Sequence, residues 1–506
     1  MEYIFLLCAL LFSLMLTKIV IKSKNNNSWK KLPPGPRQVP IIGNMHQLYG
    51  PLPHHKLRDL AKKYGPLMHL QLGEISTIVV SSPEFAREVY RTHDIIFAER
   101  AELLSISIVS YNFLGIVFAP YADYWRQLRK ICTMELLSPK RVQTFRSIRE
   151  EEVLNMIKSI ALQKGSSVNL SRKIFSLTYG ITAQAAFGQK GKYQEQFIML
   201  VDEMVKLAGG FSLVDMYPSI KLLERISGTR TKLEKLHKQI DGILQTIVNE
   251  HKKKLEKEEL GSGEKKVDLV DVLLNIQKRG EFEPPLADTN VKAIIYDIFS
   301  AGSETSSTTV EWAISEMIKS PAVMKRAQDE VRNIFKERRN VDESNLDELK
   351  YLQAVIKETM RLHPSAPLLL PKESTEKCEI KGYEIPAKTR VIVNAWALGR
   401  DPMYWSEAEK FNPERFIDSE LDFRGNHFEY IPFGAGRRIC PGISFALPNI
   451  ELPLAQLLFH FDWKLPGDLK QEQLDMTEVF GVTVRRKNDL QVIPVPYSHS
   501  SLNKDL

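Results

Sequence analysis

One short loop constrains this chain more than any other part of it: residues 432–442, which read PFGAGRRICPG. Its glycines allow a tight turn and a close approach to a flat ligand, and its two arginines can pair with carboxylates. Pro441 has no N–H and fixes the chain as it enters the next element. A lone cysteine is more often a small buried hydrophobic residue, but this setting favours a loop that presents the sulfur of Cys440.

Composition describes an ordinary globular chain with a mild positive charge. Of its 506 residues 43% are hydrophobic, and 69 Lys and Arg against 62 Asp and Glu give a net charge of +7. Over this length such a charge does not indicate a nucleic-acid partner, and it suits contact with anionic lipid or an acidic protein. The four cysteines are Cys8, Cys132, Cys378 and Cys440, and none of them form a CxxC pair. Cysteines this few and this scattered are typical of a reducing compartment.

The N-terminus combines an apolar stretch with trailing lysines. A membrane-spanning helix needs about 20 apolar residues, so residues 1–21 are expected to form an anchor. The lysines that follow predict that the body of the protein stays in the cytosol. A cleaved signal peptide is the alternative, but it would carry its positive charge before the apolar stretch.

The remaining chain shows no internal repeat and no second linker. Residues 22–37 are basic and rich in proline, which predicts a stiff hinge or a plain linker. Residues 38–495 are then expected to form one large domain, followed by a polar tail over 496–506.

Hydrophobic periodicity predicts a mainly α fold with small β-sheets. Helical periods dominate between about residues 140 and 362, and short alternating runs at 67–72 and 77–80 are typical of strands. The charged segment 251–266 is expected to be a solvated loop.

A run of small and polar residues interrupts the helical stretch expected over residues 291–319. The run is Ala301-Gly302-Ser303-Glu304-Thr305. Glycine costs about 1 kcal/mol in a helix relative to alanine, and Ser and Thr compete for backbone hydrogen bonds. Such a local break in a core helix indicates a functional site, and a polar face turned to solvent is the alternative.

Glu358 and Arg361 form an ExxR pattern on a helix expected over residues 345–362. Their spacing places both charges on one face, where they can pair. The pattern is weak alone, but Phe411–Phe416, which contains Arg415, follows it and the cysteine loop comes next. Two further copies, at Glu84 and Glu88, lack this context.

Trp125 and Arg129 form a WxxxR pattern in a helical stretch expected over residues 124–137. A second copy, Trp396 and Arg400, lies in an irregular context, so only the first is retained.

In this order, the motifs resemble the cytochrome P-450 superfamily over residues 33–495, and the cysteine loop resembles its haem-binding loop at every position. The resemblance implies the cytochrome P-450 fold and haem b, with Cys440 as the axial thiolate ligand of the iron. It also implies haem propionate contacts from Trp125, Arg129, Lys372 and Arg438. Lys372 stands where relatives mostly have Arg, and it keeps the charge without the bidentate fork.

The resemblance assigns further roles. Glu304 takes the place of an acid, and Thr305 that of an alcohol, which supply protons to O2 over the haem. Ser303 stands where plant members usually have Thr. Glu358, Arg361 and Arg415 would form a buried ion-pair network that locks the haem-side core.

The expected function is that of a monooxygenase with a separate electron donor, since the chain has no dinucleotide fingerprint. The resemblance implies NADPH–cytochrome P-450 reductase as a partner, cytochrome b5 as a further one, and a single-pass location in the endoplasmic reticulum membrane. The alternatives are a reductase-independent haem-thiolate lyase or isomerase and a non-enzymatic sensor or electron carrier.

The sequence resembles the plant A-type clan, especially terpenoid-oxidising members, which implies a sesquiterpene or diterpene substrate. An alkaloid or a flavonoid is the alternative. The candidate pocket residues are mostly aliphatic, which suits an apolar small molecule, although any of them could instead belong to the core: Ile106, Val109, Phe299, Ala301, Ala366, Leu370, Phe480 and Val482.

Overall fold

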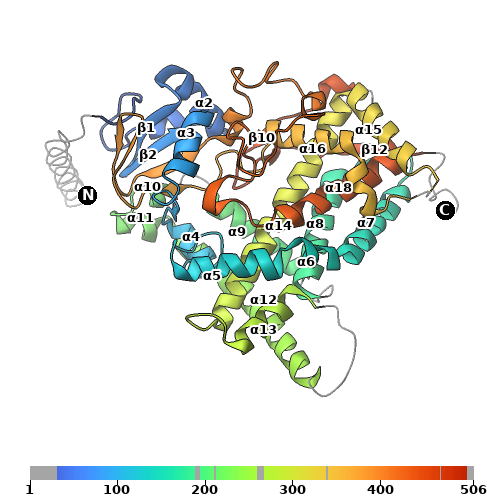
Figure 1. Ribbon diagram of the computed structural model, residues 1–506, viewed down its shortest axis with the longest axis horizontal. Helices are drawn as coiled ribbons and strands as arrows, with labels where there is room; N and C mark the ends of the chain where they lie inside the picture. Colours follow the sequence, from blue (N-terminus) through green and yellow to red (C-terminus); the bar gives the residue numbers. More distant parts are fainter. Residues whose placement is uncertain are drawn as a thin grey trace, which may run out of the picture.

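Helices build most of the molecule, and small sheets lie to one side (Figure 1). The computed structural model describes residues 31–188, 194–209, 212–258, 267–337, 340–467 and 469–497. The expected anchor lies outside these residues, and so does most of the expected tail. Among the helices that are described, none combines the length and apolar character that a membrane crossing requires.

The helices are numbered as in Figure 1. In chain order they are α2 (Pro53–Tyr64), α3 (Pro83–Arg87), α4 (Leu104–Val109), α5 (Asp123–Ile131), α6 (Pro139–Thr144), α7 (Arg146–Ala161), α8 (Leu170–Phe187), α9 (Gln194–Ala208), α10 (Leu213–Met216), α11 (Lys221–Ile226), α12 (Thr229–Glu258), α13 (Leu269–Arg279), α14 (Asp288–Lys319), α15 (Pro321–Ile334), α16 (Lys350–Leu362), α17 (Ala395–Leu398) and α18 (Ile443–His460).

The strands are short. They are β1 (Leu67–Leu72), β2 (Ile75–Val80), β3 (Glu99–Arg100), β4 (Val168–Asn169), β5 (Lys372–Glu373), β6 (Cys378–Ile380), β7 (Tyr383–Ile385), β8 (Arg390–Val393), β9 (Phe461–Lys464), β10 (Glu478–Val479), β11 (Arg485–Arg486) and β12 (Gln491–Pro496).

The largest sheet has five strands in the order β1-β2-β8-β5-β3. Strands β2 and β8 are parallel, and the other neighbouring pairs are antiparallel. Because β3 pairs with β5 in a register that sets Arg100 opposite Lys372, two cationic residues far apart in the sequence become neighbours.

Helix α14 runs through the middle of the molecule and packs against α8 and α18 (Figure 1). It is buried on most sides, with Val310 and Trp312 fully enclosed, as expected of a core helix. It begins three residues earlier than expected, and the Asn290 side chain accepts a hydrogen bond from Ala287 N–H at that end. It ends before Pro321, which opens α15.

Two expected helices differ in their bounds. α16 begins at Lys350 rather than at residue 345, because Glu343–Glu348 form a separate 3₁₀ turn. The Glu330 carboxylate, from α15, accepts hydrogen bonds from the first backbone N–H groups of α16 at 2.7 and 2.9 Å. The helix expected to end at residue 137 is regular only to Ile131, and a wider helical turn over Cys132–Leu136 follows it.

The loop expected over residues 251–266 is helical in its first half, because α12 continues to Glu258. His251 and Lys252 hold this end of the helix in place: the His251 ring lies 3.0 Å from the Asp268 carboxylate, and Lys252 Nζ lies 2.6 Å from that of Asp288. Tertiary contacts therefore override the polar composition.

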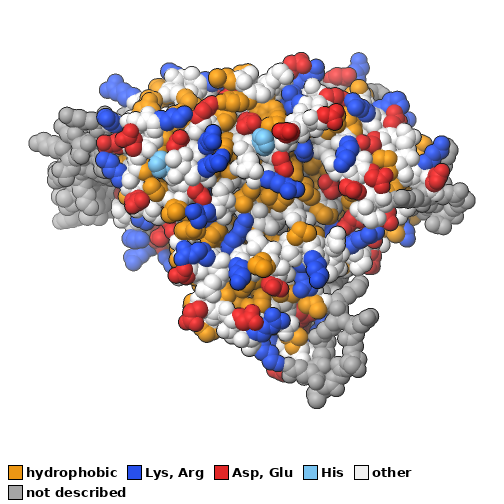
Figure 2. Space-filling model, viewed as in Figure 1, with side chains coloured by type: hydrophobic (Ala, Val, Ile, Leu, Met, Phe, Trp, Pro, Cys, Tyr) orange, Lys and Arg blue, Asp and Glu red, His pale blue; other side chains and the backbone are white. Residues whose placement is uncertain are grey.

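On the face seen in Figure 2, basic and acidic side chains are intermixed.

A buried ion-pair network fixes the loop that precedes the cysteine loop. Glu358 is fully buried and accepts hydrogen bonds from Arg361 at 2.7 and 2.8 Å, from Arg415 at 3.1 Å and from the Asn412 backbone at 2.8 Å. One carboxylate thus joins α16 to the segment after α17.

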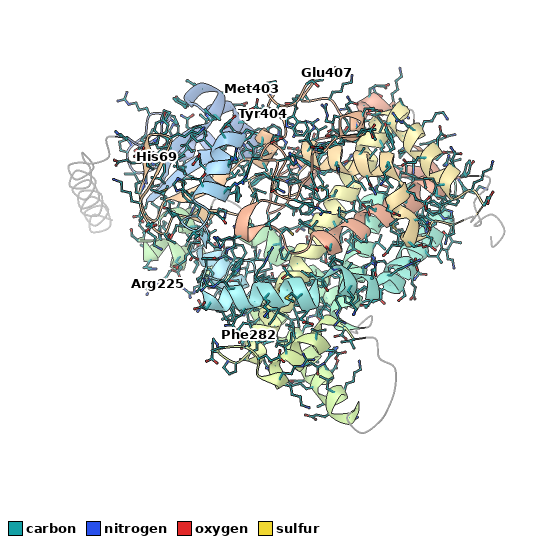
Figure 3. The ribbon with its side chains drawn as sticks, viewed as in Figure 1. His69, Arg225, Phe282, Met403, Tyr404 and Glu407 are labelled. Carbon is teal, nitrogen blue, oxygen red and sulfur yellow. The ribbon has the colours of Figure 1, made fainter. Side chains whose placement is uncertain are left out.

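The same loop has an exposed outer side. Figure 3 shows Met403, Tyr404 and Glu407 at the edge of the molecule, where Met403 is 84% exposed. On its inner side the carbonyls of Ala408 and Lys410 accept hydrogen bonds from Arg361. Arg361 therefore holds the backbone of a loop whose outer surface contributes little packing.

We expect Glu358→Ala to lose about 3–5 kcal/mol of unfolding free energy, because it leaves buried arginines unpaired. The yield of folded protein and a urea unfolding curve measure the loss. Glu84→Ala removes the acid of an equivalent but exposed ExxR pattern and should cost less than about 1 kcal/mol. Equal stability of the two variants would contradict a structural role for the network.

Candidate active site

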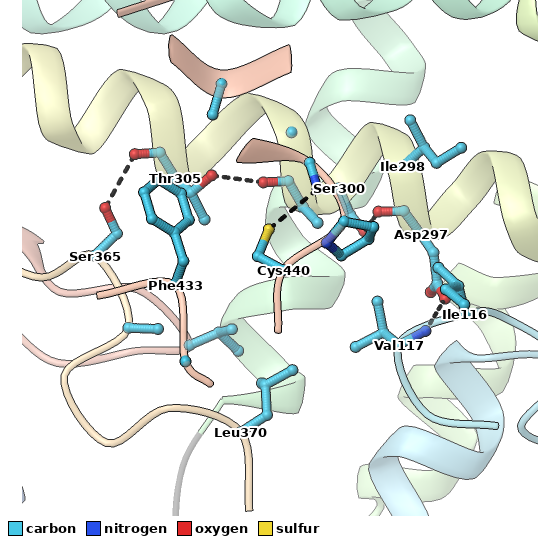
Figure 4. A pocket seen from close by; sticks show the side chains of 18 of the residues that line it. Ile116, Val117, Asp297, Ile298, Ser300, Thr305, Ser365, Leu370, Phe433 and Cys440 are labelled. Carbon is cyan, nitrogen blue, oxygen red and sulfur yellow. Dashed lines mark hydrogen bonds between the residues drawn. The ribbon is translucent and has the colours of Figure 1, made fainter. Parts of the chain in front are cut away.

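A cavity of about 340 Å³ lies between α14 and the cysteine loop. Figure 4 shows the sulfur of Cys440 below α14, with Thr305 and Asp297 to either side of it in this view. The wall combines aliphatic residues with a few charged ones, which is typical of a ligand site.

The cysteine loop curls so that Cys440 faces the cavity. Its backbone N–H donates to the Phe433 carbonyl at 3.0 Å, and the Gly442 N–H donates to the sulfur at 3.3 Å. Gly436 has a φ of +66°, and a side chain there would lie 2.5 Å from the Tyr90 carbonyl oxygen, so glycine is required. Burial raises the pKa of the Cys440 thiol, while the Gly442 N–H and Arg129 oppose that rise.

One face of α14 forms the wall opposite the cysteine. Asp297, Ala301 and Thr305 recur every four residues, which places them on the same side of the helix, and all three line the cavity. Glu304 also reaches it. Ser303 does not line the cavity: it is fully buried, and its hydroxyl donates to the Phe299 carbonyl at 2.8 Å.

Glu304 and Thr305 have separate hydrogen-bond partners. The Glu304 carboxylate accepts from the Thr483 hydroxyl at 2.6 Å, and the Thr305 hydroxyl donates to the Ala301 carbonyl at 2.7 Å. Burial raises the pKa of Glu304, although Thr483 and the nearby Arg485 work against it. The acid therefore retains its proton at a higher pH than a solvated glutamate does.

Four cationic side chains meet at one end of the cavity: Arg100, Arg129, Lys372 and Arg438. Their hydrogen bonds go to backbone carbonyls, those of Val117, Leu370, Ile439, Phe97, Ala98 and Ala119. Trp125 lines the same end, and its ring N–H donates to the Ile116 carbonyl at 3.0 Å.

Burial lowers the pKa of each of these four cationic groups, and for Lys372 and Arg438 the neighbouring cations add to the effect. Burial and the neighbouring Arg100 lower the pKa of Arg438 to about 9, and burial lowers that of Arg100 to about 10. Burial also lowers the pKa of Lys372 well below its usual value. One guanidinium nitrogen of Arg438 is buried with no hydrogen-bond partner among the described residues.

The structure separates the expected pocket residues into two groups. Six line the cavity: Ile106, Val109, Ala301, Ala366, Leu370 and Val482.

The structure corrects the other two. Phe299 points into the core, where its ring lies 4.7 Å from that of Phe197, because it sits on the side of α14 that faces away from the cavity. Phe480 lies outside the cavity and stacks on His54 at 5.8 Å.

Two charged residues that line the cavity escaped the motif analysis. Arg100 reaches it through the pairing of β3 with β5, a long-range contact that the local sequence does not reveal. Asp297 is a buried acid that belongs to no motif, but its spacing of four residues from Ala301 was visible in the sequence.

Comparison with known proteins decides the family. The Cytochrome P450 family profile matches residues 33–492. The chain belongs to the cytochrome P450 family. Enzymes of this family are monooxygenases that carry haem with a thiolate ligand and draw electrons from NADPH through a reductase.

Plant relatives match over nearly the whole chain. Tabersonine 16-hydroxylase 1 of Catharanthus roseus is 61% identical over 504 residues, 99% of each chain. Tabersonine 6,7-epoxidase isoform 1 of the same plant is 58% identical over 508 residues, and it covers 100% of each. Premnaspirodiene oxygenase of Hyoscyamus muticus is 52% identical over 498 residues, 98% of each.

The same fold occurs in a solved structure of a zebrafish cytochrome P450 with progesterone. That chain is 27% identical, has a TM-score of 0.75, and covers 88% of this chain and 99% of its own.

The residues of this cytochrome P450 fit a haem. Cations whose hydrogen bonds go to carbonyl groups favour anionic partners, which the two haem propionates would supply, and the free guanidinium nitrogen of Arg438 provides an open donor. Metal binding stabilises the deprotonated form of a buried thiol, so the raised pKa of Cys440 is compatible with an iron ligand.

We expect Arg438→Met to weaken haem retention by about tenfold or more, because a charge-assisted hydrogen bond to a propionate is lost. The haem-to-protein ratio after gel filtration at several dilutions measures this. Arg437→Met is the matched control, because Arg437 is 43% exposed and pairs with Asp94. Equal haem retention by the two variants would show that Arg438 does not hold the cofactor.

Proposed function

We propose that this chain oxidises an apolar plant specialised metabolite, with Cys440 as the thiolate ligand of the haem iron. The observation that carries the proposal is the placement of Cys440 and the α14 residues Ala301 and Thr305 in the wall of one cavity. When bound, the haem supplies the oxidising chemistry that uses O2 and electrons to place an oxygen atom on the substrate.

The protein's own residues would supply and position protons near the substrate. Glu304 lies beside the cavity, and because burial raises its pKa it keeps its proton to a higher pH than a solvated glutamate does. The Thr305 hydroxyl is turned toward the Ala301 carbonyl, which leaves its oxygen free to accept a hydrogen bond from the cavity side. We propose that Glu304 is the proton source. The Thr305 hydroxyl would orient the group that passes this proton on beside the substrate. Because no direct bond joins the two side chains, a water would complete the path.

The alternative functions have less support. A haem-thiolate lyase, an isomerase or an electron carrier has no need for an acid and an alcohol that both line the cavity, as Glu304 and Thr305 do. The names of the relatives, a hydroxylase, an epoxidase and an oxygenase, also favour oxygen insertion.

The substrate class divides between two candidates. Two relatives are named for the alkaloid tabersonine, at 61% and 58% identity, whereas premnaspirodiene oxygenase, at 52%, favours the terpenoid expected from the sequence. We propose an alkaloid as the first candidate and a terpenoid as the second. The alkaloid is placed first because the mainly aliphatic cavity wall also contains a buried carboxyl group, that of Asp297.

The proposal includes the partners and the location expected from the sequence. NADPH–cytochrome P-450 reductase would supply electrons, with cytochrome b5 as a further donor. Residues 1–21 would anchor the protein in the endoplasmic reticulum membrane through contact with lipid, followed by the hinge over 22–37, the cytosolic catalytic domain over 38–495 and the tail over 496–506.

Microsomes that contain this chain and a plant reductase test the reaction. We expect one or more members of a panel of alkaloids, sesquiterpenes, diterpenes and flavonoids to gain one oxygen atom, as seen by mass spectrometry, only when NADPH and reductase are both present. Product that forms without reductase would point to a lyase or an isomerase. Oxidation confined to flavonoids would contradict both proposed substrate classes.

We expect Thr305→Ala to lower the ratio of product formed to NADPH consumed by about tenfold or more, because proton delivery near the substrate is lost. Ser303→Ala is the control: it removes a hydroxyl from the same helix that does not line the cavity. Its ratio should stay near that of the wild type. Full coupling in Thr305→Ala would overturn the role given to this hydroxyl.

A further inference from the structure

Asp297 is an acidic residue buried in the cavity wall. Its side chain lies on the same face of α14 as Ala301 and Thr305, and the residue is 5% exposed. One carboxylate oxygen accepts a hydrogen bond from the Val117 backbone N–H at 2.9 Å (Figure 4).

No basic side chain pairs with Asp297 among the described residues of the chain. The one hydrogen bond to its carboxylate among those residues comes from the Val117 backbone N–H. Glu304, the other acidic residue of the wall, differs because it accepts from the Thr483 hydroxyl and has Arg485 nearby. A buried carboxylate without a cation is unfavourable, so Asp297 provides a carboxyl group that lacks a cationic partner within a mainly apolar wall.

We propose that Asp297 binds the protonated amine of a basic substrate and thereby selects nitrogen-containing skeletons. This inference rests on the proposed function, since it assumes that the cavity holds the substrate, and it deepens that function by naming the group that is recognised. The ammonium would donate a charge-assisted hydrogen bond to the carboxylate, and such bonds are strong where water is excluded.

The charges around the cavity would orient the bound substrate. The cationic end, formed by Arg100, Arg129, Lys372 and Arg438, repels an ammonium group, whereas Asp297 attracts one. Along the helix axis, Asp297 lies about 6 Å from Ala301 and about 12 Å from Thr305, at 1.5 Å per residue. A substrate held by its amine would therefore place those of its carbons that lie one to two helical turns from Asp297 beside Ala301 and Thr305.

The titration of Asp297 agrees with this arrangement. Burial raises the pKa of its carboxyl to about 7, although the Val117 N–H opposes the rise. A neighbouring cation favours the charged form of a carboxyl group. Asp297 can thus be partly neutral without a ligand and become a carboxylate when an ammonium binds.

A structural role alone is the alternative. Asp297 holds the segment after α4 through Val117, and Gly115 passes so close that a side chain there would lie 2.1 Å from the carboxylate. Asparagine preserves the side-chain oxygen that accepts from Val117 but removes the charge. Asp297→Asn therefore separates the two roles.

Asp215→Asn is the matched control. Asp215 is also a buried aspartate, and its carboxylate also accepts a hydrogen bond from a backbone N–H, that of Leu104, at 2.8 Å. Unlike Asp297, it does not line the cavity. The substitution makes the same chemical change beside the same region of the chain.

The test measures binding to the haem-loaded protein without reductase, so it does not depend on turnover. The probes are N-benzylpiperidine, protonated at neutral pH, and benzylcyclohexane, which has the same skeleton without the nitrogen. Their dissociation constants are measured by equilibrium dialysis with the wild type, Asp297→Asn and Asp215→Asn. We expect Asp297→Asn to bind the amine about 10- to 100-fold more weakly, with the constant for benzylcyclohexane changed less than about twofold, and Asp215→Asn to match the wild type.

Three outcomes would overturn the inference: an equal loss for both probes, no loss for either, or a wild type with no preference for the amine. The first would assign Asp297 to loop structure alone. None of them bears on whether the enzyme oxidises its substrate with reductase and NADPH, so failure of this inference and failure of the proposed function can be told apart.

Discussion

Buried positive charge at one end of the cavity is the constraint on which the rest of the site depends. Arg100, Arg129, Lys372 and Arg438 come from four different segments, and their hydrogen bonds go to backbone carbonyls. Carbonyl groups do not neutralise a cation, and Glu99 and Asp94 act on the cluster without forming a direct ion pair with it, so the protein compensates this charge only in part. A cofactor with two carboxylates would complete the compensation, and these cationic side chains would hold it. Cys440 would then hold the iron of that cofactor.

Helix α14 connects this constraint to the substrate. Its cavity face carries an acid at Asp297, a small residue at Ala301 and an alcohol at Thr305, while its opposite face packs into the core through residues such as Phe299. The cavity wall therefore carries charges of both signs. An anionic cofactor suits the basic end, and a cationic substrate suits the acidic wall. The enclosed cavity strengthens both interactions, because water screens them little.

Sequence reasoning succeeded where a feature is local. The cysteine loop and the helical patterns around Trp125 and Glu358 identified residues that the structure brings together, and hydrophobic periodicity predicted a mainly helical fold. It failed where position depends on a helix face or on distant pairing. Phe299 lies two residues from Asp297, about 200° around the helix, so it cannot share the cavity face. Arg100 enters the site only through the register of β3 with β5.

Thiolate ligation by Cys440 is tested most directly by the absorption spectrum of the reduced, full-length protein under carbon monoxide. We expect a strongly red-shifted Soret band in the wild type, because a thiolate ligand donates electron density to the iron. Cys440→His, which offers a neutral nitrogen ligand, should keep haem but lose the shift. An unshifted band in the wild type, or a red shift that survives Cys440→His, would contradict ligation by this residue.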